Sequence, residues 1–168
     1  KDFIDNQRYK AKIIISDEKE LLLNTGGGIL AATKSFKNSF ITINPDTLWN
    51  ESYAGELQNL EDFYFKKNNP CLLLVDKNLS FDTSFKGDFN LNQDVISRDK
   101  NNKFIFTGLQ ILDKNIFSSI KEKVFSMNSI WDNLIKQKNL LGVESKIKFY
   151  HLNTKETYDK ISNLKIID

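Results

Sequence analysis

The sequence predicts a single α/β domain over residues 1–168 with a mixed, mainly parallel sheet. Apolar residues recur at helical spacing from Glu56 to Phe65, and the run from Cys71 to Val75 is apolar throughout, as in a strand buried on both faces. Strands and helices alternate along the first half of the chain, which is typical of an α/β layer. A length of 168 residues suits one domain.

The segments that precede this helix are expected to be two extended pieces, a turn and a strand. The β-branched run from Ala11 to Ser16 is predicted as a strand, and Glu20 to Asn24 as a second extended piece. Thr25-Gly26-Gly27-Gly28 is predicted as a turn before a helix, because glycine adopts positive φ and lets a ligand approach the backbone. The next expected strand covers Ser39 to Asn44.

The second half of the chain changes pattern. Apolar and polar residues alternate from Phe85 to Thr107 around a turn at 100–103, which predicts an antiparallel pair ending in a strand at 104–106. The remaining predicted elements are helices at 113–120 and 128–137, strands at 140–143 and 147–152, and a final helix capped by Asn153 or Thr154 that runs through Ser162.

Composition excludes several classes of function. The net charge is only +2 and evenly spread, so no nucleic-acid partner is expected. One cysteine, Cys71, excludes an internal disulfide and a thiolate metal cluster, and one histidine, His151, excludes a His-rich zinc site. No apolar run approaches the roughly 20 residues that span a bilayer. With no signal peptide either, we expect a cytoplasmic protein with no membrane partner.

Arginine is scarce. Arg8 and Arg98 are the two arginines of the sequence, whereas lysine is abundant. Bidentate clamps on phosphate or carboxylate usually depend on arginine. A phosphate site here is therefore expected to use lysine, backbone N–H groups or a metal.

Two segments are candidates for ligand binding. The glycines after Thr25 suit an anion or the edge of a nucleobase, and they equally suit a plain helix-entry loop. Asp46 follows a predicted strand, where open α/β sheets bind ligands and where a carboxylate can hold Mg²⁺. The structural alternative for Asp46 is a turn residue after Pro45.

Two ring side chains are further candidates. His151 follows the aromatic pair Phe149-Tyr150 and is either a packed or capping residue or a metal ligand, although Mg²⁺ prefers oxygen to imidazole nitrogen. Trp131 is either a core aromatic or part of the wall of a sugar site.

Six short segments occur in an order that is more specific than any one of them. They are Asn24–Ile29, Ile43–Trp49, Lys86–Phe89, Phe106–Leu112, Phe125–Asp132 and Phe149–Thr154. In this order they resemble the "TGGG", "NGDVLW", "GDF", "YTGIQIL", "FSLNPLWD" and "W-x-D/H-V-G-T-P" segments of the nucleotidyltransferases that activate sugar 1-phosphates. The most similar are the N-acetylmuramate 1-phosphate uridylyltransferases and the mannose-1-phosphate guanylyltransferase-like proteins.

The resemblance implies a Rossmann-like nucleotidyltransferase fold, truncated at the N-terminus, and transfer of a nucleotidyl group from a nucleoside triphosphate to a sugar 1-phosphate. The products would be a nucleotide sugar and pyrophosphate, and such chemistry depends on positioning and charge neutralisation. By the same resemblance Asp46 is the catalytic metal ligand for Mg²⁺, with His151 as a second metal-site residue. Thr25, Gly26 and Gly27 would bind the nucleotide. Gly108 and Trp131 would lie on the sugar side.

The sequence departs from this family in four places. Pro45 replaces the usual glycine before the metal aspartate, His151 stands where many relatives have a second carboxylate, and Asn153 replaces glycine. The family also opens with a loop of the form G-x-G-T-R-x-x-P, followed by Pro-Lys, that holds the triphosphate. No such loop occurs in this sequence.

Two interpretations therefore remain open. In the first, the chain is the C-terminal two-thirds of a nucleotidyltransferase, either a shortened form or half of a split gene whose partner is a separate N-terminal fragment. In the second, it is a catalytically silent remnant or interaction module that retains the sugar-side half of the fold. Whether the chain is an enzyme by itself, and which sugar and base it uses, are not determined by the sequence.

Overall fold

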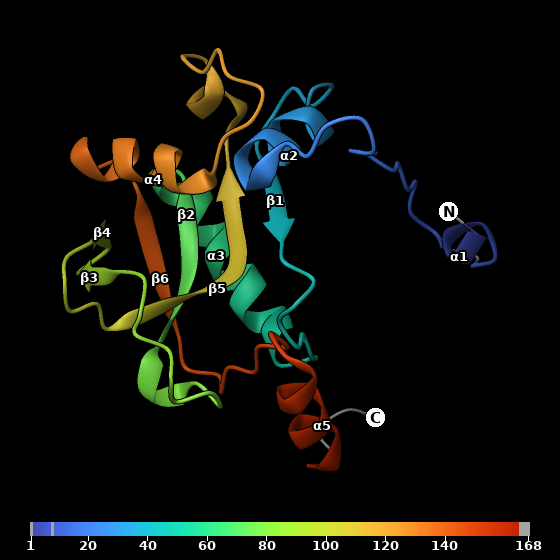
Figure 1. Cartoon of the computed structure of the whole chain (residues 1–168). Coiled ribbons are helices and arrows are strands. Elements are labelled where there is room, and N and C mark those ends of the chain that lie inside the picture. The colour runs from blue at the N-terminus through green and yellow to red at the C-terminus, as the bar shows by residue number, and fades with distance from the viewer. Residues whose placement is uncertain (1, 8, 165–168) are drawn as a thin grey trace.

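A six-stranded sheet runs through the middle of the protein, with helices packed on both faces (Figure 1). The computed structural model describes residues 2–7 and 9–164. The strands lie side by side in the order β1-β5-β2-β6-β4-β3. Their bounds are β1 (Phe40–Ile43), β2 (Cys71–Asp76), β3 (Asn90–Asn92), β4 (Val95–Ser97), β5 (Phe104–Leu112) and β6 (Leu141–Ser145).

The helices are α1 (Asp2–Asp5), α2 (Asn24–Ala32), α3 (Tyr53–Lys67), α4 (Met127–Lys136) and α5 (Lys155–Asn163), with 3₁₀ turns η1 (Lys77–Leu79) and η2 (Lys114–Phe117). Helices and strands alternate from α2 to β2, and four strands, β2 to β5, then follow one another with one 3₁₀ turn between β2 and β3. Among the helices in the described ranges, none has the length and apolar character needed to cross a bilayer.

The strand directions confirm the predicted α/β fold with a mixed sheet. Strand β5 pairs antiparallel with β1 on one side and with β2 on the other, while β2 and β6 pair in parallel. Strands β1, β2 and β6 therefore point the same way. Fewer neighbouring strands are parallel than the sequence predicts. Among the strands within residues 2–7 and 9–164, β2 and β6 form the one parallel pair. Strands β1 and β2 are not neighbours, because the antiparallel strand β5 lies between them.

Helix α3 and strand β2 form where the sequence predicts them. The amide of Asn68, a residue with φ of 54°, donates to the carbonyl of Tyr64 over 2.7 Å and ends the helix before Pro70. Every residue of β2 from Cys71 to Val75 is fully buried. The predicted helix over 128–137 and the cap at Thr154 are also confirmed, since the Thr154 hydroxyl accepts from the amide of Thr157.

The apolar core has two main parts, one on each face of the sheet. Helices α2 and α4 cover the first part, and α3 covers the second. The first cluster includes Phe40, Leu72, Leu74, Leu112, Met127, Ile130 and Trp131. The second includes Tyr53, Leu60, Tyr64, Leu73, Leu109 and Ile111.

Three predicted elements are wrong. The run from Ala11 to Ser16 is not a strand but an exposed segment that extends away from the sheet (Figure 1), since it has no neighbouring strand to pair with in the described chain. The extended piece predicted at Glu20–Asn24 gives way to α2 at Asn24. The residues 147–152 form isolated bridges through Phe149 and His151 instead of a strand.

Candidate functional site

The end of β1 lies against the middle of β5. The amide of Asn44 donates to the carbonyl of Gly108 over 3.0 Å. Gly108 has φ of +94°, and a Cβ atom there would lie 2.6 Å from Cβ of Asn44. Glycine at this position therefore allows both the backbone conformation and the close approach of the two chains. Gly108, predicted on the sugar side, is itself buried beneath Asn44.

Asp46 lies just beyond the end of β1, at the position the sequence predicts. Its carbonyl accepts from the amide of Leu152, and Thr47 forms a bridge with His151. The hydroxyl of Thr47, a buried residue, donates to the carbonyl of Thr107 over 2.7 Å. The backbone on both sides of Asp46 is thus tied to β5 and to the segment that carries His151.

Asp46 and His151 form a direct side-chain pair. His151 Nε2 lies 3.2 Å from Asp46 Oδ2, and 45% of the Asp46 side chain is exposed against 23% of His151. The rings of Phe85 and Phe149 pack on the imidazole. The buried atoms Asp46 Oδ1 and His151 Nδ1 have no hydrogen-bond partner. A proton on Nε2 satisfies this geometry, because Nε2–H then donates to Oδ2 of Asp46.

The Asp46–His151 pair can supply one carboxylate ligand to a magnesium ion. Mg²⁺ usually takes one or two carboxylates and completes its shell with phosphate oxygens and water. Asp46 offers a carboxylate on a side chain that is 45% exposed. Within residues 2–7 and 9–164, no group of three or more His, Cys, Asp or Glu could hold a metal ion. The residues present therefore suit an ion that arrives with a phosphorylated ligand, rather than one held by protein groups alone.

Asp82 is a neighbour of this pair that sequence reasoning missed. Hydrogen bonds from Ser84 lower the pKa of the Asp82 carboxyl, with smaller contributions from Asn153 and from the nearby His151. Nδ2 of Asn153 lies 3.4 Å from Asp82 Oδ2. Both residues line a cavity of about 460 Å³ at the start of α5. Asp82 lies in an irregular loop far from Asn153 in sequence, so no motif could have signalled it.

The predicted glycine turn is instead the first turn of α2. The amides of Gly26 and Gly27 both donate to the carbonyl of Phe125, over 2.9 and 3.1 Å, and both residues are buried. A Cβ on Gly27 would lie 2.2 Å from the carbonyl oxygen of Lys123. These glycines allow close packing of two chain segments, and their N–H groups are already occupied. Thr25 is exposed, and its hydroxyl accepts from the amide of Met127.

Trp131 is a core residue with one polar contact. It is 9% exposed, and its ring packs edge-on against Phe106 and Phe89. Its Nε1–H donates to Oε1 of buried Gln110 over 3.1 Å. Gln110 is two residues beyond Gly108 and faces the same side of β5. Sequence reasoning did not select Gln110, although a glutamine inside a buried strand is itself a signal of a specific polar partner.

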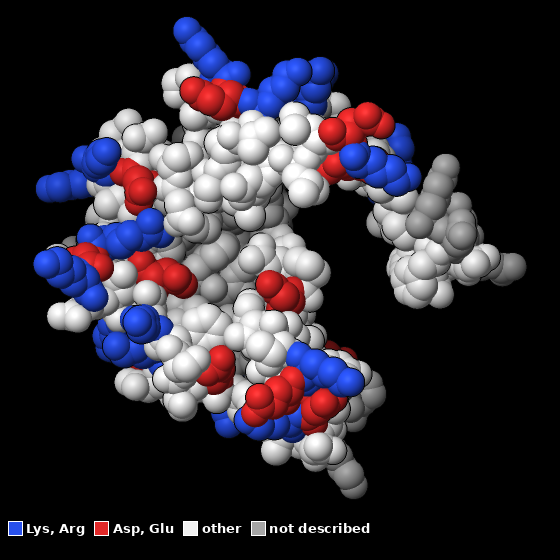
Figure 2. Space-filling view, viewed as in Figure 1, with Lys and Arg blue, Asp and Glu red and all other residues white. Residues whose placement is uncertain are grey.

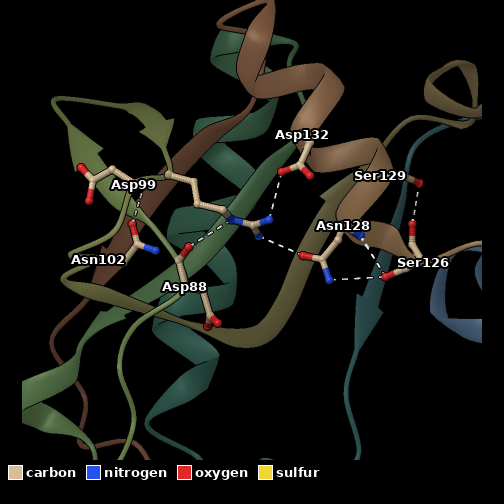
Figure 3. A network of polar contacts seen from close by, with 8 residues as sticks. Asp88, Asp99, Asn102, Ser126, Asn128, Ser129 and Asp132 are labelled. Carbon is tan, nitrogen blue, oxygen red and sulfur yellow. Dashed lines mark hydrogen bonds and ion pairs between the residues drawn. The ribbon is translucent and has the colours of Figure 1, made fainter.

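Arg98, which follows β4, connects the hairpin of β3 and β4 to α4. Its guanidinium donates to Asp132 Oδ1 and Asn128 Oδ1, each over 2.9 Å, and to the carbonyl of Asp88 (Figure 3). It also lies 4.5 Å from the ring centroid of Phe89. The other arginine, Arg8, lies outside the described residues. The one described guanidinium is therefore engaged in holding the fold and is not free to clamp a phosphate.

The candidate residues follow one face of the sheet. Along β5, Gly108 and Gln110 face the side covered by α2 and α4. Gly108 contacts Asn44 at the end of β1, and Gln110 accepts from Trp131. Figure 2 shows the surface hollowed between the part formed by α2 and α4 and the part that ends in α5, with acidic side chains at the margin.

Comparison with solved structures identifies the fold. HddC from Yersinia pseudotuberculosis, complexed with GMP-PN, matches with a TM-score of 0.70 and 22% identity over 98% of this chain and 72% of HddC. UDP-glucose pyrophosphorylase complexed with UDP-glucose matches with a TM-score of 0.65 and 19% identity over 85% of this chain and 62% of its own. A proposed glucose-1-phosphate thymidylyltransferase from Bacillus anthracis matches with a TM-score of 0.66 and 16% identity, over 87% of this chain and 63% of its own.

These neighbours have the nucleotidyltransferase fold that the sequence motifs imply. At the level of sequence, no protein-family model and no curated protein matches the chain. The chain therefore has the α/β fold of the sugar-1-phosphate nucleotidyltransferases and spans about two-thirds of the length of the structures it matches.

Proposed function

We propose that this chain carries the metal and acceptor side of a sugar-1-phosphate nucleotidyltransferase. The observation that carries the proposal is the Asp46–His151 pair at the carboxyl end of β1, beside the Asn44–Gly108 contact. In α/β sheets, ligands bind at the carboxyl ends of the strands. The reaction would join an oxygen of the sugar phosphate to the α-phosphorus of a nucleoside triphosphate, and pyrophosphate would leave.

The nature of the ligands is supported by the structural neighbours. One neighbour is complexed with GMP-PN, one with UDP-glucose and one with UTP. A nucleoside triphosphate and a sugar 1-phosphate are therefore the proposed substrates. The proposal does not specify the base, because the neighbours bind guanine and uracil nucleotides.

Each site residue has a proposed role. Asp46 would hold Mg²⁺ through the exposed part of its carboxylate, and His151 fixes the carboxylate by donating to Oδ2. When bound, the ion supplies neutralisation of charge on the α-phosphate. Thr25, the exposed residue at the start of α2, faces the base, whereas Gly26 and Gly27 hold the start of α2 against Phe125. Gly108 and Trp131 shape the sugar side from below, through Asn44 and Gln110 respectively.

The described chain supplies little that could neutralise a triphosphate. Arg98 is engaged by Asp132 and Asn128, and the amides of Gly26 and Gly27 are engaged by Phe125. We therefore expect negligible turnover from this chain alone. Activity would require a further segment that carries the phosphate-binding loop.

The test is pyrophosphate release in the presence of such a segment. The probe is a separately produced segment that carries a loop of the form G-x-G-T-R-x-x-P followed by Pro-Lys. With UTP or GTP and a sugar 1-phosphate, we expect release only when both chains are present. Asp46→Ala should reduce it at least 100-fold, and Asp94→Ala, which removes an exposed carboxylate paired with Lys67, should leave it unchanged.

Two outcomes would contradict the proposal. Release by this chain without the probe would remove the need for a second segment. Release that survives Asp46→Ala would remove Asp46 from the metal site. No release with both chains, together with an unaltered fold, would favour the catalytically silent module.

A further inference from the structure

A polar cavity of about 520 Å³ lies between the segment after β2, the loop that carries Phe85 and the turn before β5. Three lysines, Lys77, Lys86 and Lys100, are in its lining, and among the described residues no acidic side chain lines it. We call it the lysine cavity. Its volume is within the range of small-ligand sites, which is roughly 300–1,000 Å³. The proposed function uses none of these lysines.

The three lysines come from three chain segments that meet at Asn102. Nζ of Lys77 donates to the carbonyl of Asn102 over 3.3 Å. Gly87, which follows Lys86, lies so close that a Cβ atom there would be 2.6 Å from the same carbonyl oxygen. Lys100 belongs to the turn that contains Asn102. Contacts with one residue therefore hold the three lysine-bearing segments together.

The turn that contains Lys100 is ordered by its own side chains. Oδ1 of Asn102 accepts from the amide of Asp99 over 3.0 Å (Figure 3), and Oδ1 of Asp99 accepts from the amide of Asn101 over 2.7 Å. Nδ2 of Asn90 donates to Oδ2 of Asp99 over 2.9 Å. A ligand beside Lys100 therefore meets a backbone that is already ordered, which lowers the entropic cost of binding.

The carboxylates closest to this cavity in sequence are engaged by other groups. Asp76 pairs with Lys103 over 3.0 Å and accepts from the amide of Asn78. Asp82 accepts from the amide of Ser84 over 2.9 Å. Among the ion pairs of residues 2–7 and 9–164, none includes a lysine of the lysine cavity. An anionic ligand would supply the negative charge that these three ammonium groups lack.

We infer that the lysine cavity binds a small anion that carries a diphosphate group. A lysine ammonium binds phosphate oxygens as a point charge, and the sequence, with two arginines, predicts that a phosphate site here depends on lysine. A diphosphate distributes its charge over two phosphoryl groups, so it matches three ammonium groups from three segments better than one phosphate does. The inference does not rest on the proposed function, because neither Asp46 nor His151 lines this cavity.

Acidic side chains around the lysine cavity favour a small ligand over a nucleic acid. Asp76, Asp82 and Asp99 each precede a residue that lines the cavity. A long polyanion that extended beyond the cavity would meet these carboxylates, and like charges repel. A ligand contained within the cavity would instead meet the lysines.

An NMR titration of the full chain with inorganic pyrophosphate tests the inference. The sample contains EDTA, so that no metal can bridge the ion to Asp46. We expect saturable chemical-shift changes centred on the amides of Lys86, Lys100 and Asn101, and at least tenfold weaker binding of orthophosphate. Changes that are centred elsewhere, or equal affinities for the two ions, would overturn the inference.

Substitutions that remove lysine charges provide a matched pair. The double variant Lys86→Gln/Lys100→Gln should weaken pyrophosphate binding at least tenfold. Lys66→Gln also removes a lysine charge, but in the last turn of α3, which precedes β2, whereas Lys77 follows β2, so the affinity should not change. These lysines are exposed, so the variants should keep the fold. Equal weakening by Lys66→Gln would mean that overall charge attracts the ion, and would overturn the inference.

Two further probes identify the source of the diphosphate group. Binding of GDP at the same amides would show that the cavity takes the diphosphate of a larger ligand, whereas binding of pyrophosphate alone would show that it takes the free ion. Both results support the inference. A single-stranded DNA oligonucleotide that binds these amides more tightly than either probe would overturn it. Because neither a metal ion nor a triphosphate is present, failure of this inference leaves the proposed function untouched.

Discussion

Strands β1 and β2 flank the same strand, β5, and both pair with it antiparallel. Their surroundings are opposite. In β2 the residues from Cys71 to Val75 are fully buried, whereas in β1 two of the four residues are more than two-fifths exposed. Strand β2 has a further neighbour in β6, and β1 has none among the described residues. The two strands have similar apolar sequences, so composition alone does not reveal which of them has neighbours on both sides.

The comparison explains why one margin of the protein differs from the rest. The sheet is covered on both faces around β2 and β5, with its polar groups largely paired. At β1 the packing is incomplete, and the apolar side chains of Ile41 and Ile43 are partly exposed to solvent. The Asp46–His151 pair lies just beyond the end of β1. The proposed reaction therefore takes place beside the strand of the sheet that is the least enclosed.

The most direct way to break the comparison is to truncate one side chain in each strand. Leu72→Ala in β2 should lower the free energy of unfolding by about 2–5 kcal/mol, because a fully buried leucine leaves a cavity. Ile43→Ala in β1 should cost less than about 1 kcal/mol, since half of that side chain is already in water. Urea unfolding of both variants is the measurement. Equal losses would show that β1 is as enclosed as β2.

Gly27 in α2 and Gly55 in α3 test how tightly these two helices are packed. Gly27→Ala should destabilise the protein by about 1–3 kcal/mol, because its Cβ would collide with the carbonyl oxygen of Lys123. Gly55, in α3, has no atom within 4 Å of such a Cβ, so Gly55→Ala should stabilise by about 0.5–1 kcal/mol. Thermal unfolding compares the two, and a stabilising Gly27→Ala would rule out the close packing of α2.

The hydrogen bond from Trp131 to Gln110 tests the packing of β5, the strand that lies between β1 and β2. Gln110→Leu should cost about 1–3 kcal/mol, because it leaves the indole N–H buried without an acceptor. Trp131→Phe removes that N–H, so the double variant should lose less than the sum of the two single losses. Urea unfolding of the three variants forms the cycle. Strict additivity would mean that the bond contributes nothing.

Alkaline pH gives the smallest of these effects, and the Cys71 thiol of β2 contributes to it. Burial raises the pKa of the Cys71 thiol from 9.0 to about 12. In the unfolded chain the thiol ionises near pH 9, so its contribution to stability is complete below pH 9 and is lost as the pH rises toward 12. Between pH 9 and 10 the loss should be about 1 kcal/mol. Urea unfolding at both values should show a shallower pH dependence for Cys71→Ala, and an unchanged one would place the thiol in water.

The elements that the sequence predicts well are those determined by local pattern. The helical spacing in α3, the apolar run of β2 and the cap at Thr154 each depend on neighbouring residues. The run from Ala11 to Ser16 has an equally strong strand pattern, yet a strand also needs a partner, which local sequence does not specify.

The residues of the candidate site also differ in how well the sequence predicts them. Asp46 and His151 were selected from motifs, and the fold brings them into contact. The glycines after Thr25 were expected as a ligand-facing turn, but their amides are occupied by Phe125, a residue about a hundred positions later. Gln110 and Asp82 were missed because their partners, Trp131 and Asn153, are distant in sequence.

The central claim is that Asp46 and the start of α2 belong to one site that binds a metal and a nucleotide. Paramagnetic line broadening of backbone amides by Mn²⁺, added with GMP-PN, tests it most directly. We expect the strongest broadening around Asp46 and Gly108, weaker broadening at Thr25, and loss of both in Asp46→Asn. Broadening that is centred elsewhere, or that persists in Asp46→Asn, would contradict the claim.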